Sequence, residues 1–290
     1  GGRRDAPGDP PPYVPFIAAA KEYKTKPTQH SVKQLQELGV QPDMLVLRTE
    51  HELNPEILRK VALFCNVSKE AVIQSVDVPT IYEVPLMLQR QRMDSIALEK
   101  LGLEVGPTPE LNPWKDFLDR KKRATDVVRI GLVGKYVELQ DAYKSIDESL
   151  LIASIYNDRK LDLRLIHSEK INDANAAELL ADLDGVVIAP GFGQRGVEGK
   201  FAALRYLREH DIPTLGICLG MQCMVIEFAR DVLGLEGANS TEMDPQTLHP
   251  VIDLMEDQKN VVNMGGTMRL GTYDCTLRPG SHIYAAYGKE

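Results

Sequence analysis

Short apolar runs alternate with amphipathic stretches along the C-terminal half of the chain. Val, Ile and Leu dominate the runs, as is typical of buried strands, at 127–133, 161–166, 186–189 and 214–217. Apolar residues recur at helical spacing in the stretches at 143–157, 174–183, 199–210 and 221–233. Because strands that alternate with helices pair in parallel and are covered on both faces, the pattern predicts a doubly wound, mostly parallel α/β sheet. Ligands of such sheets bind beyond the carboxyl ends of the strands.

The N-terminal half shows a less regular alternation of the same kind. It predicts strands from Tyr13, at 44–47 and at 71–76, and helices at 30–38, 55–65 and 80–104. Gly and Pro residues at 106–113 interrupt the pattern, and a charged helix at 114–123 follows. We therefore expect two α/β domains, over 13–105 and 127–290, joined by a linker at 106–126. Residues 1–12 form a Pro- and Gly-rich tail that we expect to be flexible.

Length and composition narrow the class of protein. The chain has 290 residues, which favours two domains, and 43% hydrophobic with 26% charged residues, which is typical of a globular protein in water. Its 42 acidic and 34 basic residues give a net charge of −8, which argues against a surface built to bind nucleic acid. No apolar run reaches the roughly 18 residues that a membrane helix needs. The stretch at 3–20 only loosely resembles a secretion signal, because prolines interrupt it.

Four cysteines, Cys65, Cys218, Cys223 and Cys275, form neither a C-x-x-C pair nor a cluster with zinc spacing. The sequence thus indicates no disulfide framework and no metal site, and a reducing cytoplasm fits best. Residues 216–220, GICLG, have the form G-x-C-x-G between a predicted strand and a predicted helix. A lone cysteine is more often buried in a core, and we expect that of Cys223. Strand, turn and helix together instead favour Cys218 as a nucleophile at an elbow, where the helix N-terminus favours thiolate.

A glycine-rich turn, APGFGQRG at 189–196, follows the strand next to this elbow. Glycine pairs are common in any tight turn, but a turn beside a thiolate can offer backbone N–H groups to an oxyanion. A second string, KTKPTQ at 24–29, places two lysines at a predicted helix start, where a triphosphate could bind. A solvated basic loop is the alternative for that string.

Four strings in order, KTKPTQHSV at 24–32, GICLGMQ at 216–222, ANSTE at 238–242 and GGTMRLG at 265–271, resemble the CTP synthase family. The resemblance implies that 13–105 is the C-terminal part of an amidoligase domain. It also implies that the chain from 127 is a class I glutamine amidotransferase domain, truncated at its C-terminus. Such an enzyme hydrolyses glutamine at a cysteine and adds the ammonia to UTP, activated by ATP, to make CTP. The family forms tetramers, so the resemblance also implies a homo-oligomer. The net charge and the short apolar runs argue against nucleic acid and membrane as partners.

Motif matching assigns residues to these reactions. Cys218 is implied as the nucleophile, with Gly191 and the Leu219 backbone as the oxyanion hole. The residues implied to bind glutamine are Gly191, Leu219, Gly220, Met221, Gln222 and Glu242. Those implied to bind UTP or CTP are Lys24, Thr25, Lys26, Pro27, Thr28, Gln29 and Lys60. Asp77 and Val78 match positions near ATP, and residues 134–144 and 195–198 resemble segments associated with GTP activation. An exposed surface carboxylate is the alternative for Glu242.

Two expected features are missing from the chain. No His-Pro-Glu or similar His-x-Glu motif occurs late in the chain, where class I amidotransferases carry the base for the thiol. No phosphate loop of the form G-x-x-x-x-G-K-[ST] is present, and no upstream acidic pair that could hold Mg²⁺. We therefore expect an incomplete piece of a longer enzyme, inactive by itself, although the whole enzyme needs Mg²⁺ and ATP. Two alternatives stay open: a catalytically inactive nucleotide-binding or assembly module, and another class I amidotransferase or cysteine hydrolase.

Overall fold

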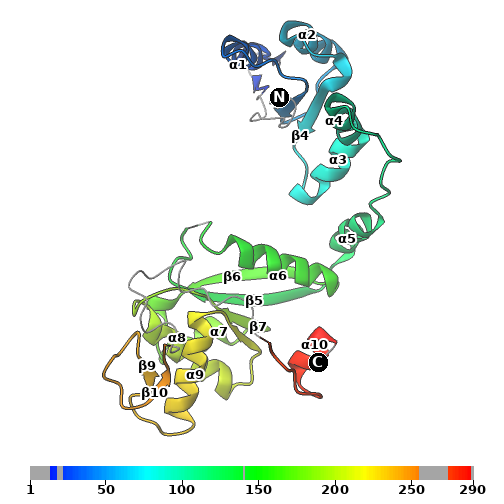
Figure 1. The fold of residues 1–290 in the computed structure, drawn as a ribbon. Helices are drawn as coiled ribbons and strands as arrows, with labels where there is room; N and C mark the ends of the chain where they lie inside the picture. The colour runs from blue at the N-terminus through cyan, green and yellow to red at the C-terminus, as the bar shows by residue number, and fades with distance from the viewer. Residues whose placement is uncertain (1–13, 18–21, 140, 255–273, 289–290) are drawn as a thin grey trace. The chain divides into compact units, whose positions relative to one another are not determined.

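The chain forms two compact units, Gly1–Arg123 and Ala124–Glu290 (Figure 1). The computed structural model describes residues 14–17, 22–139, 141–254 and 274–288. The predicted tail at 1–12 and the string at 265–271 lie outside these residues. None of the helices within them is both long enough and apolar enough to cross a lipid bilayer.

The first unit combines a small parallel sheet with several helices. Its strands are β1 Phe16–Ile17, β2 Glu22–Tyr23, β3 Leu45–Thr49 and β4 Val72–Val76. Its α-helices are α1 Lys26–Glu37, α2 Pro55–Cys65, α3 Val84–Arg90, α4 Met93–Leu101 and α5 Asn112–Arg123, and its 3₁₀ helices are η1 Lys69–Ala71 and η2 Ile81–Glu83. Strands β3 and β4 pair in parallel, and β1 and β2 form an antiparallel hairpin.

Helix α2 shows how local sequence sets the boundaries in this unit. The Asn54 side chain accepts hydrogen bonds from the N–H groups of Glu56 (2.7 Å) and Ile57 (3.3 Å), and Pro55 occupies the first turn. The helix ends where Asn66 adopts a left-handed conformation with φ of 54°. The prediction of a helix at 55–65 is confirmed. Its apolar side packs against β3 and β4 in a core that includes Leu47, Val61 and Cys65.

Two other predictions for the first unit are wrong in detail. The predicted helix at 80–104 is broken, because Arg92 adopts a left-handed backbone with φ of 57° between α3 and α4. The Gln91 side chain at this break pairs with the backbone of Gln74, accepting from its N–H and donating to its carbonyl, each at 2.8 Å. The helix predicted from His30 begins earlier, at Lys26, because Pro27 fits the first turn of a helix.

Helix α5 lies within the segment that the sequence suggested as a linker, but it packs on the first unit. The Trp114 indole donates to the Tyr82 carbonyl at 2.7 Å, and the rings of Tyr82, Trp114 and Phe117 pack in tilted and edge-on contacts with centroids 5.2 to 5.9 Å apart. Phe117 and Leu118 are buried. The boundary between the two units therefore falls after this helix, at residues 123 and 124.

The second unit is built on one parallel sheet. Its strands are β5 Val127–Gly134, β6 Lys160–His167, β7 Gly185–Ile188, β8 Thr214–Gly216, β9 Asn239–Ser240 and β10 Pro250–Ile252. Its helices are α6 Lys144–Tyr156, η3 Ser168–Lys170, α7 Ala176–Leu180, α8 Val197–Glu209, α9 Leu219–Asp231 and α10 His282–Tyr287. The main sheet has the order β6-β5-β7-β8 and is parallel throughout, which confirms the predicted α/β class.

Both faces of this sheet are covered, as the apolar runs predicted. Along β5, Leu132 contributes to a core under α6, whereas Val133 points to a larger core formed with α7, α8 and α9 (Figure 1). Successive residues of a strand point to opposite faces, so a strand buried on both faces is apolar throughout. The doubly wound arrangement thus follows from the sequence pattern.

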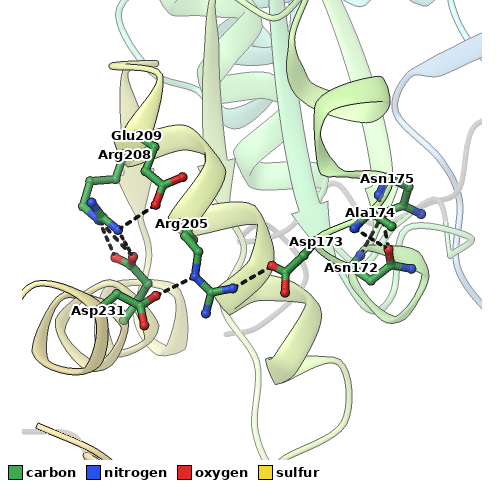
Figure 2. A network of polar contacts seen from close by, with 9 residues as sticks. Asn172, Asp173, Ala174, Asn175, Arg205, Arg208, Glu209 and Asp231 are labelled. Atoms are coloured by element: carbon green, nitrogen blue, oxygen red, sulfur yellow. Dashed lines mark hydrogen bonds and ion pairs between the residues drawn. The ribbon is translucent and has the colours of Figure 1, made fainter. Parts of the chain in front are cut away.

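Ion pairs tie α8 to α9 and to the chain before α7. Arg205 lies between Asp173 (2.6 Å) and Asp231 (2.7 Å), as Figure 2 shows. One turn further along α8, the Arg208 guanidinium reaches the buried Glu227 carboxylate of α9 at 2.9 Å. These pairs fix α9 against α8, and α9 carries the candidate nucleophile at its start.

Candidate active site

Cys218 lies at the junction of β8 and α9 in a strained backbone conformation. Its φ is 52° and its ψ is −111°, an arrangement that is uncommon for a residue other than glycine. Its side chain is exposed, whereas Cys223 one turn along α9 is buried. The prediction of an exposed cysteine at a sharp turn between strand and helix is confirmed by this geometry.

The flanking glycines make this turn possible. A methyl group on the Cα atom of Gly216 would lie 2.5 Å from the Met221 backbone nitrogen. One on Gly220 would lie 2.0 Å from the Ile188 carbonyl oxygen. Both positions therefore exclude any side chain, and the first turn of α9 packs directly on the end of β7.

The glycine-rich turn at 189–196 lies beside this elbow. A methyl group on Gly191 would be 3.7 Å from Leu219 Cδ2, so the turn and the first residue of α9 are neighbours. The Ile217 N–H also donates to the Ile188 carbonyl at 3.0 Å, which holds the approach to the elbow against β7. The structure thus brings together Gly191, Leu219 and Cys218, as predicted.

Two lysines hold the backbone carbonyls of this turn. Lys135, at the end of β5, donates from Nζ to the Phe192 carbonyl. Lys200, in the first half of α8, donates from Nζ to the Ala189 carbonyl at 2.7 Å, and the residue is only 2% exposed. Burial lowers the pKa of the Lys200 ammonium, with the nearby charge of Lys135 acting in the same direction.

The segment that carries Glu242 lies against the same turn. The Gln194 side-chain amide donates to the Met243 carbonyl, and Met243 is buried in the core formed by α8 and α9. Glu242 itself is exposed. Of the other residues predicted to bind glutamine, Leu219 and Gly220 are buried in the first turn of α9, whereas Met221 is exposed and Gln222 is half-buried.

Cys223, the second cysteine of this segment, lies in the core formed by α8 and α9. Burial raises the pKa of the second cysteine, Cys223, to about 11, so its thiol is neutral at physiological pH. Cys223 therefore belongs to the core, as predicted, whereas Cys218 is exposed.

The string at 24–29 forms the start of α1. Thr25 and Thr28 are buried, and the Gln29 side-chain amide donates to Thr25 Oγ1 at 3.1 Å. Lys26 and Pro27 are exposed. Because the first N–H groups of a helix lack partners within the helix, this end carries partial positive charge next to the lysines. Lys60 lies on the exposed side of α2, the helix that contacts α1.

Asp77 and Val78 follow β4 and line a cavity of about 430 Å³ within the first unit. The Asp77 carboxylate forms an ion pair with Arg48, and its N–H donates to the Thr49 carbonyl at 3.1 Å. The cavity is lined by apolar side chains from α3 and α5 together with charged groups, among them Glu83 and Lys122, which pair at 3.5 Å.

The two segments that the resemblance linked to GTP activation meet at one tyrosine. The Lys135 ammonium lies 5.1 Å and the Arg195 guanidinium 5.5 Å from the centre of the Tyr136 ring. Arg195 also forms an ion pair with Glu169 at 3.2 Å. Among the described residues, no group of three or more His, Cys, Asp or Glu side chains is arranged to hold a metal ion.

Sequence reasoning did not single out the role of Lys200 or of Gln194. For Lys200 a signal exists, because the lysine interrupts the apolar side of the predicted helix at 199–210, where a charged residue is out of place. For Gln194 none exists, because its partner is a backbone carbonyl 49 residues away in the sequence.

Two family models match the chain. The model described as CTP synthase N-terminus matches residues 11–103, and the model described as Glutamine amidotransferase class-I matches residues 138–289. The second match spans more than half of the chain and contains the elbow, the glycine-rich turn and the Glu242 segment.

Curated relatives with the name CTP synthase align with almost the whole chain. Those of Porphyromonas gingivalis and Bacteroides fragilis are 69% and 63% identical over 278 residues, covering 96% of this chain and 52% of each relative. The chain thus spans about half the length of the curated relatives it matches. A solved structure of the Trypanosoma brucei CTPS glutaminase domain with bound acivicin is 37% identical over 46% of this chain and 52% of that one, with a TM-score of 0.44.

Proposed function

Because the chain belongs to the class I glutamine amidotransferases, in the branch of the CTP synthases, we propose that it contributes the glutamine-hydrolysing site of a CTP synthase. The ammonia released there would be added to UTP, activated by ATP, to give CTP. One observation carries the proposal for this chain's own residues: an exposed cysteine on a strained elbow, with a glycine-rich turn beside it.

The first step is attack by the Cys218 thiolate on the side-chain carboxamide carbon of glutamine. A C–S bond forms, and the carbonyl electrons move to oxygen to give a tetrahedral oxyanion. The backbone N–H groups of Gly191 and Leu219 are the proposed donors to this oxyanion. When the oxyanion collapses, the C–N bond breaks, and the nitrogen takes a proton and leaves as ammonia. Water then attacks the thioester, which releases glutamate and returns the thiolate.

Substrate recognition is assigned to the segments around this elbow. The Glu242 carboxylate, held beside the turn by the bond from Gln194 to Met243, is suited to pair with the α-ammonium group of glutamine. Met221 and Gln222 lie on the first turn of α9 and would contact the aliphatic part and the polar groups of the substrate.

The first unit would serve the nucleotides. We propose that Lys24, Lys26 and the start of α1 bind the triphosphate of UTP, or of CTP as inhibitor, with Lys60 as a further contact. Asp77 and Val78, which line the cavity, are assigned to ATP, with Arg48 paired to the Asp77 carboxylate. The Tyr136 site with its two cations is assigned to GTP. No residue is assigned to Mg²⁺, because no suitable group of ligands occurs in the described chain.

A glutamine-like electrophile tests the proposal directly. 6-Diazo-5-oxo-L-norleucine should label Cys218 with loss of N₂, as detected by intact and peptide mass spectrometry, and L-glutamine should slow the labelling. A Cys275→Ser chain, which lacks the other exposed cysteine, should be labelled equally, and Cys218→Ala should not be labelled. Labelling that is insensitive to L-glutamine, or no labelling at all in the folded chain, would contradict the proposed site.

A second candidate function is a nucleotide-binding or assembly module without catalysis. The observation in its favour is that no His-x-Glu motif late in the chain supplies a base for the thiol. We accordingly expect little or no glutaminase turnover from the chain by itself. Calorimetry with UTP and CTP measures the binding function, and Lys24→Ala/Lys26→Ala should abolish it. Assembly is measured by light scattering with and without these nucleotides, since a homo-oligomer is expected from the family.

The four free cysteines fit a reducing compartment such as the cytoplasm.

A further inference from the structure

Lys200 is a buried ammonium group without a carboxylate partner. It is the largest side chain that the described part of the chain buries almost completely, and no Asp or Glu among those residues pairs with it. Burying an ammonium group is costly unless it forms compensating interactions. The hydrogen bond to the Ala189 carbonyl, at 2.7 Å, is the interaction that the structure provides.

The carbonyl that Lys200 holds leads directly into the glycine-rich turn. Ala189 donates its N–H to the Val133 carbonyl at 2.9 Å, so β5 fixes one side of this residue and Lys200 fixes the other. The next residue, Pro190, has no N–H and a restricted φ. The orientation of the Gly191 N–H is therefore determined by the two peptide groups that Lys200 and β5 hold in place.

Lys200 also interacts electrostatically with the nucleophile. The charged groups that face it are the thiols of Cys218 and Cys223 on α9 and the ammonium of Lys135 from β5. Ionisation of either thiol favours the charged form of Lys200, and Lys135 opposes it.

We propose that Lys200 is a positioning residue of the glutaminase site, which orients the oxyanion-binding turn through the Ala189 carbonyl. The proposal rests on the proposed function for its substrate. A lysine that only fills space in the core would not orient this turn.

The first test compares Lys200→Met, which keeps the apolar stem, with Lys160→Met, an exposed lysine at the opposite end of the sheet. Both are made in the Cys275→Ser background. In Lys200→Met we expect labelling of Cys218 by 6-diazo-5-oxo-L-norleucine to slow by about 10-fold or more, because an oxyanion donor is misplaced. Iodoacetamide needs no oxyanion donor, so its rate at Cys218 should change by less than about 3-fold. Lys160→Met should change neither rate.

The second test does not depend on the folding of Lys200→Met. NMR of lysine labelled with ¹³C at Cε follows the titration of Lys200 in the unaltered chain. Because burial lowers the pKa of this ammonium group, its midpoint should lie below the ordinary lysine value of about 10.4. An ordinary midpoint, or an unchanged rate of labelling by 6-diazo-5-oxo-L-norleucine in a folded Lys200→Met chain, would overturn the proposal. Because iodoacetamide needs no glutamine site, failure of the diazo reagent in the unaltered chain would count against the proposed function alone.

Discussion

Gly220→Ala is the substitution that most directly tests how the elbow is built. The added methyl group would lie 2.0 Å from the Ile188 carbonyl oxygen, a distance that real Cβ atoms keep above 3.0 Å. The start of α9 must therefore retreat from β7 by at least 1.0 Å, because the obstacle is backbone that cannot rotate away. Overpacking of this kind costs about 1 to 3 kcal/mol of unfolding free energy.

In Gly220→Ala, the rate of Cys218 labelling should show a larger relative loss than the unfolding free energy of the chain. A displacement of about 1 Å in a catalytic constellation lowers rates by about 100-fold, so labelling by 6-diazo-5-oxo-L-norleucine should slow by that factor. Iodoacetamide requires no aligned oxyanion donors, and its rate at Cys218 should change by less than about 3-fold. Gly106→Ala is the control, because a methyl group there meets nothing within 4 Å. Equal labelling rates in Gly220→Ala and the unaltered chain would refute the close packing of α9 on β7.

Three further predictions concern the cores. Burial raises the pKa of Cys223 to about 11, so its alkylation in the native chain should stay far slower than that of Cys218 up to about pH 10, measured by peptide mass spectrometry. The unfolding free energy should fall as the pH rises from 9 through 11, because the thiol ionises at a lower pH in the unfolded chain than in the folded one. A Cys223→Ala chain should lack this part of the pH dependence. Glu227→Ala should lower the unfolding free energy by about 2 kcal/mol in urea titrations, because Arg208 loses a charged hydrogen-bond partner; a loss below about 0.5 kcal/mol would contradict this. Leu47→Ala should destabilise the first unit by about 2 to 5 kcal/mol and leave Cys218 labelling unchanged; a parallel loss of labelling would show that the units do not fold independently.

Much of the second unit could be predicted from the sequence. Its strands are continuous apolar runs, and the spacing of the glycines around Cys218 indicates the elbow. The positions of Gly216 and Gly220 specify a close approach that other residues would prevent. The α/β alternation also fixed which strand ends lie next to each other, and thus placed the turn at 189–196 beside Cys218.

Other features depend on contacts that the local sequence does not contain. Arg92 breaks a helix without any Gly or Pro at the break, because the Gln91 side chain pairs with β4 instead of solvent. Helix α5 has a charged composition typical of an exposed linker helix, yet Trp114 and Phe117 anchor it to Tyr82. The burial of Lys200 is likewise decided by a carbonyl on another element.

The hydrogen bond from Gln194 to Met243 couples the position of the glycine-rich turn to that of the Glu242 segment. Under the proposed function, the Glu242 segment binds the α-ammonium group of glutamine and the turn binds the oxyanion formed from its amide. A substitution in either segment should therefore change both the binding of glutamine and the rate of its hydrolysis. Discrimination between glutamine and its shorter or longer homologues would accordingly depend on the Gln194–Met243 hydrogen bond as much as on the residues that contact the substrate.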